Sequence, residues 1–146
     1  MTASPRWDWA AVRAGAAVSL IFALPLAIGA RIAGNGDHEA VAVSLSIGAT
    51  IAFFVGAGCA AWIQRVGFPL SHGLVTAGGT YVAAQAVFIV VRLARGEEVR
   101  WFAVMFTLTF VMFAGLLGGL AGQRLRSAGI QPTRLAIRQD RGDGAR

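Results

Sequence analysis

Residues 39–63 read EAVAVSLSIGATIAFFVGAGCAAWI, and Glu39 at the first position is the one charged residue in this stretch. About 20 consecutive apolar residues are enough for a helix to cross the hydrocarbon core of a bilayer. Three more stretches of similar length and character occupy about residues 9–32, 69–92 and 100–122. The sequence therefore predicts an all-α polytopic membrane protein that folds as a four-transmembrane-helix bundle.

The composition of the whole chain agrees with a membrane protein. Of the 146 residues, 56% are hydrophobic and 14% are charged, and the mean hydropathy is +0.64. A soluble domain of this size cannot place that much apolar surface in its core, so lipid must cover the rest. We expect one transmembrane domain over residues 1–126, because four spans with short turns use about 90 to 100 positions. Residues 127–146 form a polar, arginine-rich tail that is predicted to be disordered.

The arginines indicate the orientation. All 13 basic residues are arginine, a usage that suggests a GC-rich bacterial genome, and nine of them fall on the side of the two termini. The other four, Arg31, Arg92, Arg95 and Arg100, fall on the opposite side. Because short cytoplasmic loops carry an excess of arginine and lysine, both termini are predicted to be cytoplasmic, with the protein multi-pass in the inner (plasma) membrane. The same bias accounts for the net charge of +6, so no nucleic-acid partner is expected.

A weak internal repeat divides the chain into halves. The sequence FVG at 54–56, followed by QR at 64–65, matches FAG at 113–115 followed by QR at 123–124 with the same spacing. Two tandem helical hairpins in the same orientation would be related by an axis along the membrane normal. The alternative is a chance match, because long apolar spans draw on a small set of residue types.

Small residues recur at helical spacing in the last three spans, so that each set lines one helix face. In lipid, helices associate through close backbone approach and van der Waals contact, which such faces permit. We expect these faces to form the bundle interior, and the alternative is a homo-oligomer seam in the fourth span. The residues are Gly56 and Ala60 in the second span, Gly73 and Ala77 in the third, and Gly115, Gly118, Gly119 and Gly122 in the fourth.

The third span has the most polar interior, with Thr80, Tyr81 and Gln85. Tyr81 and Gln85 are four residues apart and share a helix face. A glutamine amide in hydrocarbon must find a partner or cost free energy. The simpler interpretation is therefore hydrogen bonding between helices, and the functional alternative is a polar path for a substrate.

The spans contain no feature that indicates catalysis. They hold no carboxylate deep in the bilayer, no cluster of metal-ligating residues and no nucleophile beside a base, so neither an enzyme, a metal site nor a cofactor is expected. Cys59 is the single cysteine and lies in an apolar run, where it serves as a small packing residue. The partners that the sequence suggests are the bilayer itself and anionic lipid at the arginine-rich tail.

Several short motifs resemble those of the small four-span membrane proteins found widely in actinobacteria. The motifs are Trp7, RAG at 13–15, Pro25, PLSHG at 69–73, GE at 96–97 and the glycine-rich stretch 115–122. The resemblance covers about residues 6–126 and implies the four-helix topology. That family has no assigned activity, so the resemblance implies no functional residue.

Two functions are compatible with these features. The first is a non-enzymatic accessory or scaffold subunit whose small-residue faces pack against itself or against a membrane-protein partner. The second is a small oligomeric transporter or channel with a polar path along the third span. The first predicts that every polar side chain is paired within the bundle, and the second predicts a polar face that crosses the bilayer.

Overall fold

The computed structural model describes residues 7–130 and residue 132, so most of the predicted tail, residues 127–146, lies outside the described residues. All regular structure in the described part is helical. The helices are α1 (Trp9–Asn35), α2 (Glu39–Ile63), α3 (Pro69–Ala94) and α4 (Trp101–Ser127). Each of the four is long and apolar enough to cross a membrane, which confirms the predicted all-α class and helix number.

Helices α3 and α4 continue beyond the apolar stretches that predicted them, which ended at about residues 92 and 122. Each is terminated by a glycine in the left-handed region, Gly96 (φ 71°) and Gly129 (φ 77°). The backbone hydrogen bonds at both ends are those of a Schellman motif, for example from the Glu97 N–H to the Arg92 carbonyl at 2.9 Å. The ends of these helices are therefore set by the glycines, because a helix can run on into polar sequence.

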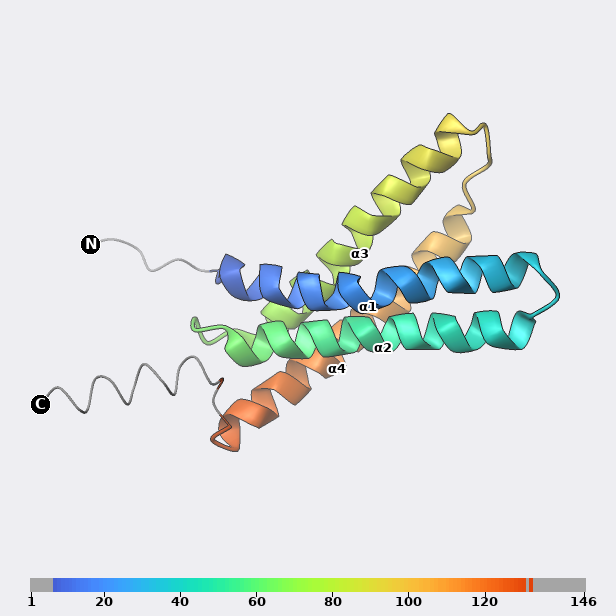
Figure 1. Ribbon diagram of the computed structural model, residues 1–146. Coiled ribbons are helices and arrows are strands. Elements are labelled where there is room, and N and C mark those ends of the chain that lie inside the picture. The colour runs from blue at the N-terminus through green and yellow to red at the C-terminus, as the bar shows by residue number, and fades with distance from the viewer. Residues whose placement is uncertain (1–6, 131, 133–146) are drawn as a thin grey trace, which may run out of the picture.

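The helices form two hairpins, α1–α2 and α3–α4, which cross at an angle (Figure 1). The described ends of the chain and the α2–α3 connection lie together, and we name this the terminal end. The loops 36–38 and 95–100 lie at the opposite side, named the loop end, where the hairpins diverge (Figure 1). Helix α2 contacts all three other helices, whereas α1 and α4 do not contact each other.

Inside each hairpin, glycine faces glycine. Gly56 of α2 lies against Gly15 and Ser19 of α1. Gly73 of α3 lies so close to α4 that a Cβ on it would stand 2.8 Å from the Gly115 carbonyl oxygen. Because Gly56 and Gly115 are the glycines of the two repeated FxG motifs, both hairpins use the same packing contact at the matching position.

Helix α4 also uses its small residues to join the hairpins. A Cβ on Gly122 would stand 2.5 Å from the Gly58 carbonyl oxygen and 2.8 Å from the Ala61 Cβ, and Gly118 lies against the same part of α2. The remaining predicted residues are also interior, since Ala60 and Ala77 are completely buried and Gly119 lies against the start of α3. All eight small residues that the sequence singled out therefore pack within one chain.

Candidate functional site

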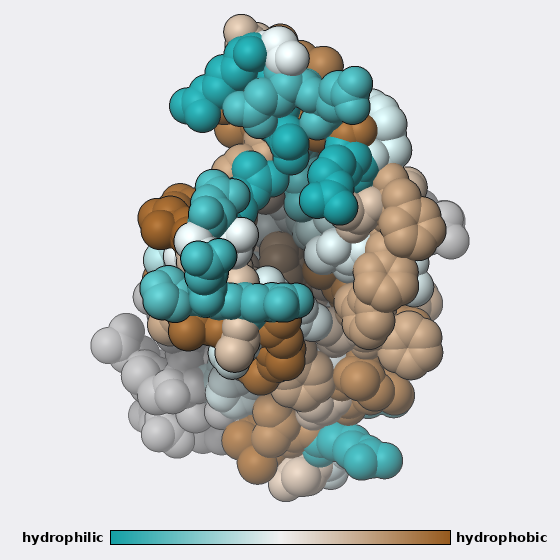
Figure 2. All heavy atoms as spheres, turned by 90° about the vertical axis from the view of Figure 1, so that its right-hand side faces the viewer, coloured by the Kyte–Doolittle hydropathy of each residue, from teal (hydrophilic) through white to brown (hydrophobic). Residues whose placement is uncertain are grey.

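A hollow opens between the two hairpins at the loop end. It comprises two adjoining cavities of about 300 Å³ and about 450 Å³. Five residues line both cavities, so the two adjoin and are described together as the hollow: Arg31, Tyr81, Gln85, Phe88 and Thr107. Figure 2 looks onto this end of the molecule and shows a recess with hydrophilic side chains above it and on its left, and hydrophobic side chains on its right.

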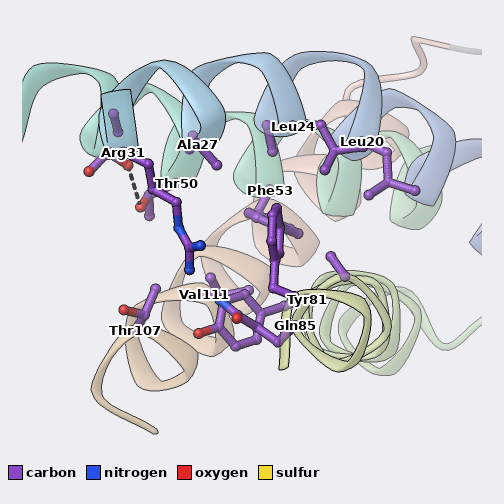
Figure 3. Close-up of a pocket in the computed structure, with 16 residues that line it drawn as sticks. Leu20, Leu24, Ala27, Arg31, Thr50, Phe53, Tyr81, Gln85, Thr107 and Val111 are labelled. Atoms are coloured by element: carbon purple, nitrogen blue, oxygen red, sulfur yellow. Dashed lines mark hydrogen bonds between the residues drawn. The ribbon is translucent and has the colours of Figure 1, made fainter. Parts of the chain in front are cut away.

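The inner wall of the hollow is apolar. Leu20 and Leu24 come from α1, Phe53 from α2 and Val111 from α4 (Figure 3). Phe53 and Val111 are buried, and the Phe53 ring lies edge-on to the Tyr81 ring with 6.1 Å between centroids. The hollow thus ends against the packed core of the bundle.

Polar groups line the hollow from all four helices. Ser46 and Thr50 come from α2, and the Thr50 hydroxyl donates a hydrogen bond to the Ser46 carbonyl. The Tyr81 hydroxyl donates a hydrogen bond to the Val104 carbonyl at 2.9 Å, which joins α3 to α4. Gln85 lies one helical turn further toward the loop end, and Thr107 lines the opposite wall. The Arg31 side chain extends from α1 across the opening toward Gln85 and Thr107 (Figure 3). Its guanidinium carbon lies 4.8 Å from the centroid of the Phe88 ring, within the range of a cation–π contact.

The mouth of the hollow is electropositive. Arg31, Arg92 and Arg100 line it together with one carboxylate, Glu97, which leaves a formal charge of +2. The Arg92 Nε lies 3.3 Å from the Glu97 Oε2, so this carboxylate is already paired. Positive charge therefore reaches the mouth from both hairpins, with Arg31 on α1 and with Arg92 and Arg100 on the α3–α4 hairpin.

Two other acidic side chains of the loop end lie on a different side of the bundle. Asp37 and Glu39 line another cavity on the α2–α4 side of the bundle, together with Phe106 and Phe110. This cavity borders the hollow, because Ser46, Thr50 and Thr107 line both. The loop end as a whole carries four arginines and four carboxylates, so its near-zero net charge conceals this separation of charges.

The structure brings Tyr81 and Gln85 together but places Thr80 on another face of α3. Successive residues of a helix point about 100° apart, and Thr80 lines a groove between α1 and α3 instead of the hollow. One turn toward the terminal end, Ala77 and Thr76 are completely buried. The polar path suggested along α3 is therefore shorter than expected and ends within the bundle.

A buried histidine connects α1 to α3 at the terminal end. His72 is completely buried, and its Nε2 lies 3.0 Å from the backbone nitrogen of Asp8 while its Nδ1 lies 2.8 Å from the Phe68 carbonyl oxygen. A backbone N–H can only donate and a carbonyl can only accept, so the ring is neutral with its hydrogen on Nδ1. This contact ties the start of α1, which the Asp8 carboxylate caps through the Ala11 N–H, to the start of α3.

A buried glutamine stabilises the α2–α3 connection through hydrogen bonds. The Gln64 side-chain oxygen accepts hydrogen bonds from the Val66 and Gly67 N–H groups, each at 2.9 Å. The Gln64 carbonyl accepts a hydrogen bond from the Arg126 guanidinium at 2.6 Å, which joins the end of α2 to α4. These contacts at the terminal end are not predicted by the sequence patterns above, in which Gln64 occurs only in the QR repeat. The one signal for them is Asp8, a capping residue directly before an apolar helix.

No protein-family model matches this chain, and no curated protein or solved structure is similar to it. The interpretation of the hollow therefore rests on its own residues.

Proposed function

We propose that the protein is a non-enzymatic binding protein of a bacterial inner membrane, which takes a ligand into the hollow from the non-cytoplasmic side. The observation that carries this proposal is the one-sided hollow, in which Arg31, Tyr81, Gln85 and Thr107 meet above an apolar wall. A few convergent polar groups in an otherwise apolar cavity are the usual composition of a ligand site. We also propose that the protein belongs with the small four-span membrane proteins of actinobacteria that its motifs resemble.

The position of Arg31 supports binding over simple packing. It lies in the last part of α1 and lines the hollow. An ionised side chain in a membrane helix is costly, and one that faces an interior space is a functional candidate by default. A scaffold role would not require a cation there.

The closed terminal end argues against an open pore. Beyond Tyr81 the helices are in backbone contact through glycines, and His72 and Gln64 hold the connections together. A hollow that is open at one end fits a protein that binds and presents its ligand. It also fits one state of a transporter that exposes its site to each side in turn.

The arginine distribution places the loop end outside the cell in this proposal, because nine of 13 arginines lie at the opposite side. Cysteine labelling tests the side and the hollow together. In a Cys59→Ala background, Thr107→Cys is expected to react with a membrane-impermeant maleimide added to intact cells, whereas Ser127→Cys at the terminal end reacts only in inside-out vesicles. Absence of reaction at Thr107→Cys from outside, with Ser127→Cys behaving as expected, would contradict the proposal.

An accessory role is the second candidate, and an exposed aromatic ridge on α4 favours it. Phe102, Phe106 and Phe110 are more than half exposed, with centroid distances of 6.0 and 5.0 Å between successive rings. The small-residue faces are used within the chain, so a partner would have to bind such an outer face. Purification in mild detergent and mass measurement of the intact complex tests this. A stoichiometric second protein that is lost on Phe106→Ala supports it, and a monomer alone contradicts it.

A further inference from the structure

We infer that the ligand of the hollow is an anionic membrane lipid, whose acidic head group lies among Arg31, Arg92 and Arg100 and whose acyl chain lies in the groove between α1 and α3. This inference rests on the proposed function, because it assigns an occupant to the same hollow. It is carried by the way the charged mouth, the apolar inner wall and the groove adjoin.

The groove is a third cavity, of about 580 Å³, on the outer side of α1 and α3. It shares Leu20, Leu24, Ala84 and Phe88 with the hollow, so the two spaces meet along a common wall. Apart from Thr80, the residues that line it are apolar or glycine. Gly79 contributes to its openness, since a Cβ placed there would have no neighbour within 4 Å.

The distance from the arginines to the nearer part of the groove, beside Leu20 and Leu24, fits one leaflet of a bilayer; the groove continues along α1 to Val12 and Trp9. From Arg31 to Leu20 the helix spans about 16 Å, at about 1.5 Å per residue. Half of the hydrocarbon core measures about 15 Å. A head group held by Arg31 at the membrane surface would therefore place its chain beside Leu20 and Leu24 within the same leaflet.

The charges at the mouth fit an acidic head group. The ion pair between Arg92 and Glu97 is the one salt bridge within residues 7–130 and 132, which leaves the guanidinium groups of Arg31 and Arg100 without a carboxylate there. A guanidinium group is planar and can donate two parallel hydrogen bonds to a phosphate. Phe88 lies under the Arg31 guanidinium and lines both spaces, so the head-group site and the chain groove meet at this residue.

A soluble anion or a neutral lipid would match only one of the two features, the charged mouth or the apolar groove. A soluble anion would pair with Arg31 and Arg100 but leave the groove between α1 and α3 without a function. A neutral lipid would fill the groove but leave an excess charge of +2 at the mouth of the hollow. An anionic lipid satisfies both the charge and the apolar surface.

Native mass spectrometry of the full chain in mild detergent tests the inference, with phosphatidic acid and phosphatidylcholine carrying the same palmitoyl chains as probes. One arginine near a membrane surface contributes enough attraction to an anionic lipid for about a fivefold preference. We expect phosphatidic acid to be retained at least about fivefold over phosphatidylcholine. Arg31→Gln should lower that preference about fivefold, and Arg95→Gln, an exposed arginine at the same end that does not line the hollow, should leave it unchanged.

A second pair of variants tests the chain groove. Gly79→Leu should lower the retention of both lipids, because its side chain fills the groove, whereas Ala86→Leu on an exposed face of α3 should not. Ala83→Leu, also in the groove, provides a second variant if Gly79→Leu does not fold.

Equal retention of the two lipids, or equal effects of Arg31→Gln and Arg95→Gln, would overturn the inference. Displacement of the bound lipid by inorganic phosphate, with no effect of either groove variant, would assign the site to a soluble anion and would also overturn it. If Thr107→Cys reacts from outside while the lipid preference is absent, the lipid assignment fails and the proposed function stands. If lipid binds as expected while Thr107→Cys does not react, the proposal that the hollow is open to the non-cytoplasmic side fails instead.

Discussion

Replacing Gly73 with alanine should loosen the contact between α3 and α4. The new Cβ would stand 2.8 Å from the Gly115 carbonyl oxygen and 2.9 Å from the Gly119 Cα, both of which are backbone atoms. Carbon atoms pack at about 3.5–4.0 Å, so the helices must separate by roughly 0.7 Å. A gap of that size removes a quarter to a half of the dispersion energy of each neighbouring contact, and overpacking of this kind costs about 1–3 kcal/mol.

The matched control is Gly79→Ala on the same helix, where the added Cβ has no neighbour within 4 Å. Alanine favours a helix over glycine by up to about 1 kcal/mol at both positions. The expected net result is a loss of about 0–2 kcal/mol for Gly73→Ala and a gain of up to about 1 kcal/mol for Gly79→Ala. Reversible unfolding in mixed detergent micelles, followed by far-UV circular dichroism, should show a difference of about 2 kcal/mol, or about thirtyfold in the folding equilibrium. Equal stability of the two variants would refute the packing argument.

Two further substitutions probe single hydrogen bonds in the same unfolding assay. Tyr81→Phe removes the bond to the Val104 carbonyl and should cost about 0.6 kcal/mol, the average for such bonds between membrane helices; a loss above about 2 kcal/mol would mean that the hydroxyl has a larger role. His72→Leu leaves the Asp8 N–H without its acceptor and should cost about 1–3 kcal/mol, whereas the exposed neighbour Ser71→Ala should change stability little, and equal losses would contradict the role of the His72 ring.

The helices were predictable because each apolar stretch is bounded by a clear stop. Glycine and proline mark the α2–α3 connection, with Gly67 at φ 83° and Pro69 opening α3. Hydropathy does not determine helix length, however, because it reports where the hydrocarbon core ends. The extension of α4 to Ser127 depends on the Schellman motif at Gly129, which no hydropathy pattern contains.

The small-residue faces were predictable as interior surface, but their partners were not. Two overlapping sets on α4 contact different helices, with Gly115 and Gly119 against α3 and Gly118 and Gly122 against α2. A spacing of four residues identifies a face that permits close approach. Which helix occupies that face depends on the crossing of the two hairpins.

The polar face of Tyr81 and Gln85 followed from helical spacing, whereas the role of Arg31 did not. In the sequence, Arg31 is one of the arginines that indicate orientation, and its place in the hollow depends on the divergence of the two hairpins, which no local pattern specifies (Figures 1 and 3). His72 appears in the sequence only as part of the PLSHG motif, which does not predict its burial. Its complete burial depends on contacts with Trp7 and Asp8, which are more than 60 residues away in sequence.

The central claim, a hollow that is open at the loop end and closed at the terminal end, is tested most directly by a depth profile along α3. Single cysteines at Arg92, Gln85, Tyr81 and Thr76, in the Cys59→Ala background, would be reacted with a water-soluble maleimide. The account predicts rapid reaction at Arg92→Cys and Gln85→Cys, slower reaction at Tyr81→Cys, and none at the completely buried Thr76→Cys. Reaction at Thr76→Cys as fast as at Gln85→Cys, or no reaction at Gln85→Cys, would contradict it.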